Sequence, residues 1–266
     1  MKLRLVTYNI HRAIGVDRRF RPGRIVEILR HHDPDVALLQ EVDQGAPRSG
    51  RLDLAREIAE AVDYQHLAIG HNVTLRRGRY GNATLSRFPI TRERNIDLTI
   101  DRRKRRGCQH TTLDLGAGLS LDVFNLHLGL SARERERQIG ILVRSPEFAC
   151  TREASPCVVA GDFNDWRSRL RVIFTEILGF RSASEQRGRT GHDIPTYPSL
   201  SPRGALDRVY YSPSLRLLGA RRCRLRTSKA ASDHLPLIVD LELDSDEPVH
   251  SRAAVGSGVE NKTIDR

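Results

Sequence analysis

One short apolar run, ending in an acid and an amide, constrains the fold of this chain more than any other stretch. Residues 158–160 are Val-Val-Ala, with Pro156 before them and Gly161 after them. Such a β-branched run between two breakers is typical of a buried strand. Alternate residues of an extended chain share a face, so we expect Asp162 and Asn164 to point the same way. The alternative is an Asx turn, in which these short polar side chains only cap their own backbone.

Polar side chains also lie at the ends of other predicted strands. A strand over residues 3–7 leads to an amide, and the run 36–39 ends in Gln-Glu. The strand 121–126 leads to a histidine in a short connection to the next helix, and a further strand over 206–211 carries an aspartate at its start. An Asp-His pair precedes the closing strand 236–243. The resulting candidate set is Asn9, Glu41, His127, Asp162, Asn164, Asp207, Asp233 and His234.

The remaining pattern predicts an α/β protein. Pro22 can open a helix, and apolar residues recur at four-residue intervals from Leu54. Short strands and turns dominate from about residue 65, and Ser131 with Glu134 forms a capping box for another helix. A further helix is expected near residues 173–178. Residues 181–201 are rich in Gly, Pro, Ser and Thr, which predicts a long surface loop. We expect one domain over residues 1–243 and a disordered polar tail over 244–266.

The charge of the chain favours anionic partners. Its formal net charge is +11, which suits nucleic acid, phospholipid headgroups or phosphorylated metabolites. One basic cluster covers residues 102–106, and a second includes Arg222, Arg224 and Arg226. On a strand these three arginines would share a face, so Arg222 and Arg224 are candidates for binding a phosphate backbone. The alternative is an ordinary solvated surface.

No apolar run approaches the roughly 20 residues that a transmembrane helix needs. The first residues alternate like a strand and contain no apolar leader segment. The four cysteines have no C-x-x-C spacing, which indicates reduced structural residues rather than a zinc site. We therefore expect a cytoplasmic protein, and its charge leaves peripheral attachment to a membrane open.

Three of the candidates suit a hard divalent cation. Mg²⁺ prefers carboxylate, amide and water oxygens, and it takes only one or two protein carboxylates directly. Glu41 is the leading ligand, with Asn9 and Asp233 beside it, and Mn²⁺ is a plausible substitute. A metal there would polarise a phosphoryl oxygen and balance the charge of the leaving group.

The other candidates suit the chemistry of a phosphoryl group. Asp162 could accept a proton from the attacking water, and Asn164 could hold that water or the phosphate. His234 could donate to the non-bridging oxygens, with Asp207 fixing its tautomer, and His127 is a second donor. Each residue alone has an ordinary explanation as a turn former or a satisfied histidine. Their coincidence at several strand ends favours a catalytic site.

The order of these motifs resembles the signature of the endonuclease/exonuclease/phosphatase superfamily. The resemblance spans residues 2–243 and rests on segments around the candidates, written here in sequence order: Tyr-Asn (8–9), Leu-Gln-Glu-Val (39–42), Gly-Asn-Ala-Thr-Leu-Ser-Arg-Phe-Pro-Ile (81–90), Asn-Leu-His-Leu (125–128), Gly-Asp-Phe-Asn (161–164), Leu-Asp-Arg-Val (206–209) and Ser-Asp-His-Leu-Pro (232–236).

This resemblance implies a four-layer sandwich, in which two mixed β-sheets pack face to face and are flanked by helices. It also implies a metal site at one edge of the sheets and the residue roles given above. In abasic-site nucleases of this superfamily, Thr-Lys usually follows the metal-binding glutamate, whereas here Val42 and Asp43 follow Glu41. The chain is more similar to the broad bacterial branch with phosphodiesterase-like and sphingomyelinase-like members.

The sequence therefore predicts a Mg²⁺-dependent phosphoesterase, acting on a phosphodiester, that uses an activated water. Three alternatives remain open at this stage. They are a nonspecific or structure-selective nuclease on DNA or RNA, a sphingomyelinase-like hydrolase of phospholipid headgroups, and a non-catalytic scaffold that binds nucleic acid or membranes.

Overall fold

A computed structural model describes residues 1–149, 156–184 and 193–243. The tail expected to be disordered, residues 244–266, lies outside the described residues, as do parts of two connections. Among the helices that the structure does describe, none has the length and apolar character to cross a membrane.

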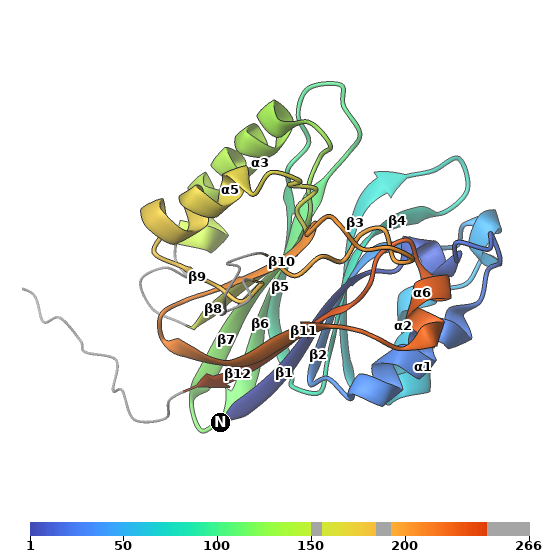
Figure 1. Cartoon of the computed structure of the whole chain (residues 1–266), viewed down its shortest axis with the longest axis horizontal. Helices are drawn as coiled ribbons and strands as arrows, with labels where there is room; N and C mark the ends of the chain where they lie inside the picture. Colours follow the sequence, from blue (N-terminus) through green and yellow to red (C-terminus); the bar gives the residue numbers. More distant parts are fainter. Residues whose placement is uncertain (150–155, 185–192, 244–266) are drawn as a thin grey trace, which may run out of the picture.

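Two six-stranded sheets form the centre of the molecule (Figure 1). The strands of the first sheet, in spatial order, are β11 (Leu215–Arg222), β12 (Leu237–Leu243), β1 (Lys2–Asn9), β2 (Val36–Gln44), β4 (Arg79–Ser86) and β3 (His66–Thr74). Those of the second are β5 (Ile90–Asp97), β6 (Gly107–Gly116), β7 (Leu119–His127), β8 (Cys157–Asp162), β10 (Asp207–Tyr211) and β9 (Arg181–Ser182). Both are mixed, because β1–β2 and β7–β8 are parallel while the other pairs are antiparallel. The predicted fold class is confirmed.

The sheets pack face to face through one side of each central strand. In β1, Leu3 and Leu5 lie in the core between the sheets, whereas Val6 and Tyr8 belong to a second core against the helices. Strands that are covered on both faces have no polar side, which is why they read as continuous apolar runs in the sequence. The opposing sheet contributes Val158 to the same central core.

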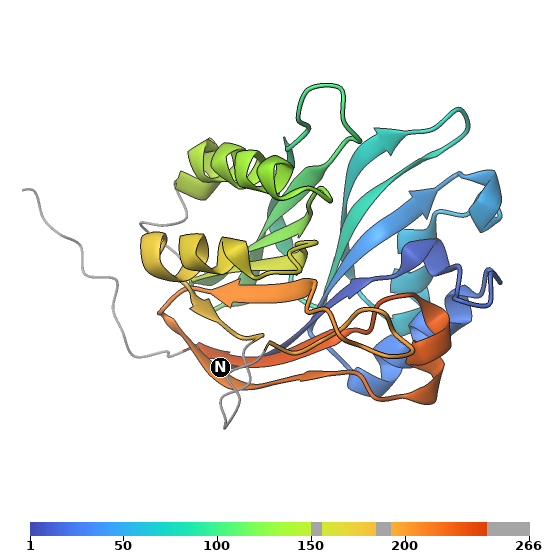
Figure 2. The same cartoon turned by 45° about the horizontal axis from the view of Figure 1, so that its top comes forward.

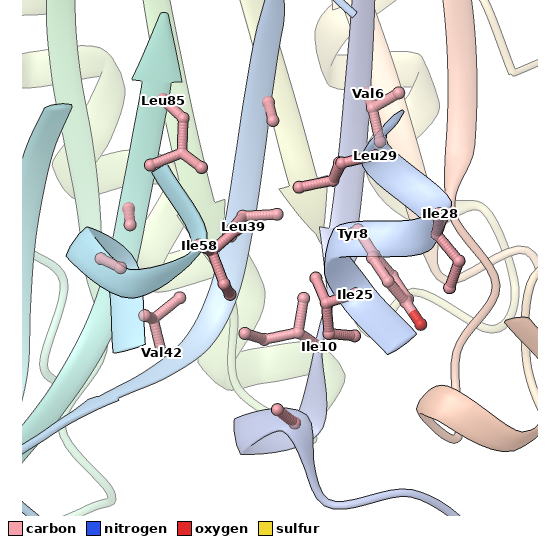
Figure 3. Close-up of a cluster of buried hydrophobic side chains, with 14 of the residues drawn as sticks. Val6, Tyr8, Ile10, Ile25, Ile28, Leu29, Leu39, Val42, Ile58 and Leu85 are labelled. Carbon is pink, nitrogen blue, oxygen red and sulfur yellow. The ribbon is translucent and has the colours of Figure 1, made fainter. Parts of the chain in front are cut away.

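Helices cover the two outer faces (Figure 2). The first sheet is covered by α1 (Pro22–His32), α2 (Leu54–Val62) and the short α6 (Arg226–Ala231). Figure 3 shows this layer, where Ile25, Ile28 and Leu29 of α1 and Ile58 of α2 pack on the strands. The second sheet is covered by α3 (Ala132–Arg144) and α5 (Arg169–Val172), which continues as the π-helical turn Ile173–Ile177. Short 3₁₀ turns occur at His11–Ala13 and Pro47–Ser49.

Several local expectations are wrong. The strand that carries Glu41 does not end there, because β2 continues to Gln44 through a bulge. His127 is the last residue of β7 rather than part of a connection. Arg222, Arg224 and Arg226 do not share a strand face, since β11 ends at Arg222 and Arg226 begins α6.

The long loop predicted over residues 181–201 is only partly at the surface. Residues 185–192 lie outside the described part of the chain. Thr196 and Ser199 are fully buried, because their hydroxyls and backbone groups hydrogen-bond to neighbouring segments. A polar composition therefore misled the prediction, since the polar groups of this segment are satisfied inside the protein.

Candidate active site

The topology brings the candidate residues to one edge of the sheets. Asn9, His127 and Asp162 are the last residues of β1, β7 and β8. Asp207 starts β10, which runs antiparallel to β8, and His234 precedes β12, which runs antiparallel to β1. Parallel strands end, and antiparallel partners begin, at the same edge. In Figure 1 this is the edge opposite the labelled N-terminus.

The carboxylate of Asp162 lies at the centre of the group. Its Oδ2 accepts a hydrogen bond from Asn9 Nδ2 at 3.0 Å, and lies 3.4 Å from His127 Nε2 and 3.7 Å from His234 Nε2. Its Oδ1 accepts the backbone N–H of Asn164 at 3.0 Å. The Asx turn therefore exists, and it orients the same carboxylate that faces both histidines.

Asn164 is held in the left-handed region, with φ of 51°. Its side-chain Nδ2 donates to the carbonyl oxygen of Leu128 at 3.0 Å, which ties the turn after β8 to the segment after β7. The residue lines the same pocket as Asp162.

His234 is buried between two carboxylates. Its Nδ1 lies 2.8 Å from Asp207 Oδ2, an oxygen that also accepts the hydroxyl of Thr196 at 2.5 Å. Burial by itself lowers the pKa of His234, but the charges of Asp207 and Asp162 outweigh burial and raise it to about 10. The imidazole is therefore a cation at neutral pH, with Nδ1–H bonded to Asp207 and Nε2–H directed toward Asp162.

Asp162 and His127 have the opposite electrostatic character. The pKa of Asp162 is raised to about 6, because burial, with the charge of Asp207, outweighs the lowering by His234, Asn9 and the Asn164 backbone. Burial lowers the pKa of His127 well below its ordinary value, and the charges of Arg106 and His234 lower it further. Asp162 is thus poised to exchange a proton near neutral pH, while His127 stays neutral.

A bulge directs Glu41 to the edge of the first sheet. Leu39 faces the helices and Gln40 faces the other sheet, so regular alternation would turn Glu41 toward the helices. The register between β2 and β4 instead shifts between Leu39 and Val42, with Glu41 at φ of 56°, and Val42 takes the helix-facing place. The extra residue leaves the Glu41 carboxylate at the rim of the pocket.

A left-handed turn follows Asn9. His11, Arg12 and Ala13 have φ angles of 45°, 61° and 56°, a conformation that costs about 1–2 kcal/mol per residue. The turn places Arg12 Nε at 3.4 Å from Glu41 Oε2. Backbone strain of this kind persists where the surrounding structure fixes the chain, and here it adjoins two of the candidates.

One pocket, with a volume of about 570 Å³, contains most of the candidates. Asn9, Glu41, His127, Asp162, Asn164, Asp233 and His234 line it, and Asp207 lies beneath. Glu41 and Asp233 carry carboxylate oxygens and Asn9 an amide oxygen, which also accepts the backbone N–H of His11 at 3.1 Å. Asp162, Asp207 and His234 form a tighter group whose facing atoms lie within 4.8 Å of one another. The tighter group is bonded internally through His234, so Glu41 and its neighbours suit a hard cation better.

Arg222 and Arg224 lie elsewhere. They line a second pocket together with His32, and the guanidinium of Arg222 donates to the carbonyl oxygen of Pro195 at 3.1 Å. The active-site pocket is instead lined by the other basic cluster, through Arg103, Lys104 and Arg106.

The sequence reasoning also missed an apolar rim on this pocket. Leu130 and Trp166 line it and are 76% and 56% exposed. Trp166 packs edge-to-face on Tyr197, which in turn contacts the ring of His234. The position of the chain's one tryptophan two residues after Asn164 was the available signal.

A buried amide layer supports the site from below. Asn125 accepts from Gln40 Nε2 at 2.8 Å and donates to the carbonyl oxygens of Leu39 and Ala83 in the first sheet. Asn82 returns a hydrogen bond to the Asn125 carbonyl at 2.9 Å. These bonds join β7 of the second sheet to β2 and β4 of the first, and so fix how the two halves of the pocket face each other.

Comparisons with known proteins identify a family and proteins of similar fold. The sequence profile of the Endonuclease/Exonuclease/phosphatase family matches residues 6–234. An uncharacterised protein of Escherichia coli strain K12, YbhP, is 29% identical over 90% of this chain and 96% of its own length. Among solved structures, the human Nocturnin catalytic domain with bound sulfate has a TM-score of 0.75 and 22% identity, covering 91% of this chain and 95% of that one. A mannosyl-6-phosphatase of Bacteroides thetaiotaomicron has a TM-score of 0.68 and 19% identity, covering 91% and 100%.

Proposed function

Because this chain belongs to the endonuclease/exonuclease/phosphatase family, we propose that it is a divalent-metal-dependent hydrolase that cleaves a phosphodiester by direct attack of water. The observation that carries the proposal is the position of Asp162. Its buried carboxylate lies beside a neutral imidazole and a cationic one, at the edge of a pocket with further carboxylates. A binding surface for anions has no use for such a group.

Asp162 is proposed as the general base. A pKa of about 6 leaves its carboxylate ionised at neutral pH, yet basic enough to take a proton from water. Asn9 and the backbone of Asn164 each occupy one oxygen and fix the direction of the carboxylate. The amide of Asn164 remains proposed as a contact for the water or the phosphate.

The two histidines are proposed to bind the phosphoryl oxygens as the negative charge develops. His234 is kept protonated by Asp207, so it can donate from Nε2 while its ring stays fixed. His127 is held neutral and supplies a second donor. Preorganised donors of this kind are typically worth a factor of 100 or more in rate for each donor.

Mg²⁺, with Mn²⁺ as a substitute, is the proposed cofactor. Glu41, with Asn9 and Asp233, would hold it, because all three line the pocket and their side chains contain the oxygen ligands that this cation prefers. When bound, the ion polarises a phosphoryl oxygen and offsets charge on the leaving group. In the absence of a metal, the positive charge of Arg12, which contacts Glu41, offsets the negative charge of this carboxylate.

The apolar rim supports a diester over a small monoester. Leu130 and Trp166 are exposed beside the catalytic groups, and they offer surface to a substituent beyond the phosphate. A nuclease is the second candidate, since Arg103 and Lys104 line the same pocket and an aromatic ring beside cations suits a nucleic-acid strand. The cytoplasmic location stays a prediction.

The test is hydrolysis of bis(p-nitrophenyl) phosphate with and without Mg²⁺ or Mn²⁺. We expect activity with either metal, no activity in excess chelator, and near-complete loss in Asp162→Asn and in His234→Ala. Asp101→Asn is the matched control, because Asp101 is exposed and pairs with the exposed Arg137. Activity that persists in chelator would refute the metal-dependent mechanism. A screen of DNA, RNA, phospholipid and phosphomonoester substrates then separates the remaining alternatives.

A further inference from the structure

Arg106, the residue directly before β6, is a buried cation to which the described residues offer no side-chain partner. The residue is 6% exposed, and its Nε has no acceptor. Within the described residues, no carboxylate lies within ion-pair range of its guanidinium, and no hydrogen bond from that group was found to any acceptor. Yet the side chain lines the active-site pocket.

Two other deeply buried arginines, unlike Arg106, have carboxylate and hydrogen-bond partners. Arg208, 1% exposed, pairs with Asp193 at 2.7 Å and also donates to Ser168 at 2.8 Å. Arg135, 6% exposed like Arg106, lies 3.5 Å from Asp165 and donates to the carbonyl oxygen of Leu130 at 2.7 Å. The Nε of each of these two arginines also lacks an acceptor, but their terminal nitrogens have protein partners, which distinguishes them from Arg106 among the described residues.

An unpaired buried charge is costly to the folded state, and replacing such a charge by an apolar group often stabilises a protein. The nearby cations do not relieve the cost. Lys104 lines the same pocket, and Arg103 is already paired with Glu134 at 3.3 Å. An anion that enters the pocket would supply the acceptors that the described residues do not give Arg106.

The position of Arg106 indicates which anion this is. It lies one residue before Gly107, at the end of β6 that adjoins His127 on β7 and, through it, Asp162 on β8. His127 and Asp162 belong to the second sheet and Arg106 directly precedes its strand β6, whereas Asn9 and Glu41 come from the first sheet. The pocket thus has Asn9 and Glu41 on one side and the donors His127 and Arg106, beside Asp162, on the other, and a phosphoryl group is the anion that fits between them.

We propose that Arg106 is a catalytic residue whose guanidinium binds the non-bridging oxygens of the phosphoryl group directly. This deepens the proposed function and rests on it. A guanidinium presents several N–H donors in a planar fork that matches two phosphate oxygens, which a lysine cannot do. The donors from the second sheet also form an oxyanion site that works without metal, so inorganic phosphate alone is a ligand.

The test compares Arg106→Met and Arg106→Lys with wild type, and uses Arg105→Gln as the control. Arg105 is the exposed neighbour on the same loop and does not line the pocket. Phosphate binding is measured in chelator by calorimetry and by the fluorescence of Trp166, the only tryptophan of the chain and a residue of the pocket wall.

We expect Arg106→Met to weaken phosphate binding at least tenfold and to lower kcat/KM by about 100-fold or more. Arg106→Lys should keep part of the binding and lose most of the rate. Without phosphate, Arg106→Met should melt at the wild-type temperature or above it, because an unpaired buried charge is removed at similar volume. A structural role predicts the opposite shift.

Two results overturn the inference. One is wild-type phosphate affinity and kcat/KM in Arg106→Met. The other is a marked fall in melting temperature together with unchanged phosphate affinity in the folded Arg106→Lys variant. If wild type hydrolyses no phosphoester, the proposed function fails, and the phosphate-binding and melting measurements still decide the anion site. If metal-dependent hydrolysis is present but indifferent to Arg106, only the inference fails.

Discussion

Replacing Gly161 by alanine should dislocate the proposed general base without altering any polar group. Gly161 precedes Asp162 and pairs with Leu126 of β7 in the parallel register. Its φ is 142°, and a Cβ there would lie 1.9 Å from the carbonyl oxygen of Leu126. Real Cβ contacts are rarely shorter than 3.0 Å, so β8 must retreat from β7 at the residue that positions the carboxylate.

The expected loss of stability follows from the unfavourable φ angle and the short Cβ contact. A residue forced into a glycine-only conformation costs about 1–3 kcal/mol, and an overpacked buried contact costs a similar amount. We expect a loss of about 4 kcal/mol, which lowers the melting temperature of a domain of this size by about 8–16 °C. A displacement of about 1 Å in a catalytic group costs on the order of 100-fold in rate, so kcat/KM should fall by that factor in the folded variant.

The assay is thermal unfolding followed by circular dichroism, with hydrolysis measured well below the transition. Gly23→Ala is the matched control, because nothing lies within 4 Å of a Cβ at Gly23 in α1, and alanine there should stabilise the helix by about 0.5–1 kcal/mol. If Gly161→Ala melts with wild type and keeps its kcat/KM, the argument that this glycine sets the position of Asp162 is wrong.

Two further outcomes can be measured on the same protein. The raised pKa of Asp162 predicts that kcat/KM increases with pH through about 6 as the carboxylate ionises, and a pH profile without this acid limb would exclude Asp162 as the base. The pKa of His234 is raised from 6.5 to about 10 in the folded protein. The stability that its charge contributes is therefore complete below pH 6.5 and is lost as pH rises through about 10. The melting temperature of wild type should fall over that interval, and the melting temperature of Asp207→Asn should fall less. Trp166→Ala should raise KM for bis(p-nitrophenyl) phosphate several-fold and leave kcat for p-nitrophenyl phosphate nearly unchanged, because Trp166 is proposed to contact the substituent rather than the phosphate. Equal effects on both substrates would contradict this assignment.

The architecture was predictable from the sequence because its information is local. A β-branched run between two breakers indicates a buried strand at residues 158–160. Pro22 and an apolar stripe indicate helix α1. The ordered motifs then identified the edge at which strand ends meet. Asn9, Asp162 and His234 could be grouped because each adjoins a predicted strand.

Features that depend on pairing between distant strands were not predictable in this way. No glycine or proline marks the bulge at Glu41, which exists because β2 must pair with β4 on both sides of an extra residue. The burial of Arg106 goes with its position directly before β6, which pairs with β7, while in the sequence it is the last of a run of basic residues.

The prediction for the second basic cluster was wrong for the opposite reason, because a pattern in the sequence indicated a surface that does not form. Arg222 and Arg224 alternate as strand residues do, but the backbone N–H of Cys223 bonds to Pro236 just as β11 ends, and the chain turns into α6. A charge pattern of period two therefore indicated a face that the backbone does not build. Only the register of the neighbouring strand decides where such a pattern stops.

The pairing of β1 with both β2 and β12 fixes when in synthesis the site can form. Strand β1 is made first, yet one of its two neighbours is β12, whose partner bonds are made only after residues 237–243 have been added. Ser232 Oγ then donates to the carbonyl oxygen of Asn9 across 223 residues of chain. Closing such distant contacts is entropically slow, so a nascent chain that lacks β12 would hold an unpaired edge on β1 and require protection from aggregation until the last strand emerges.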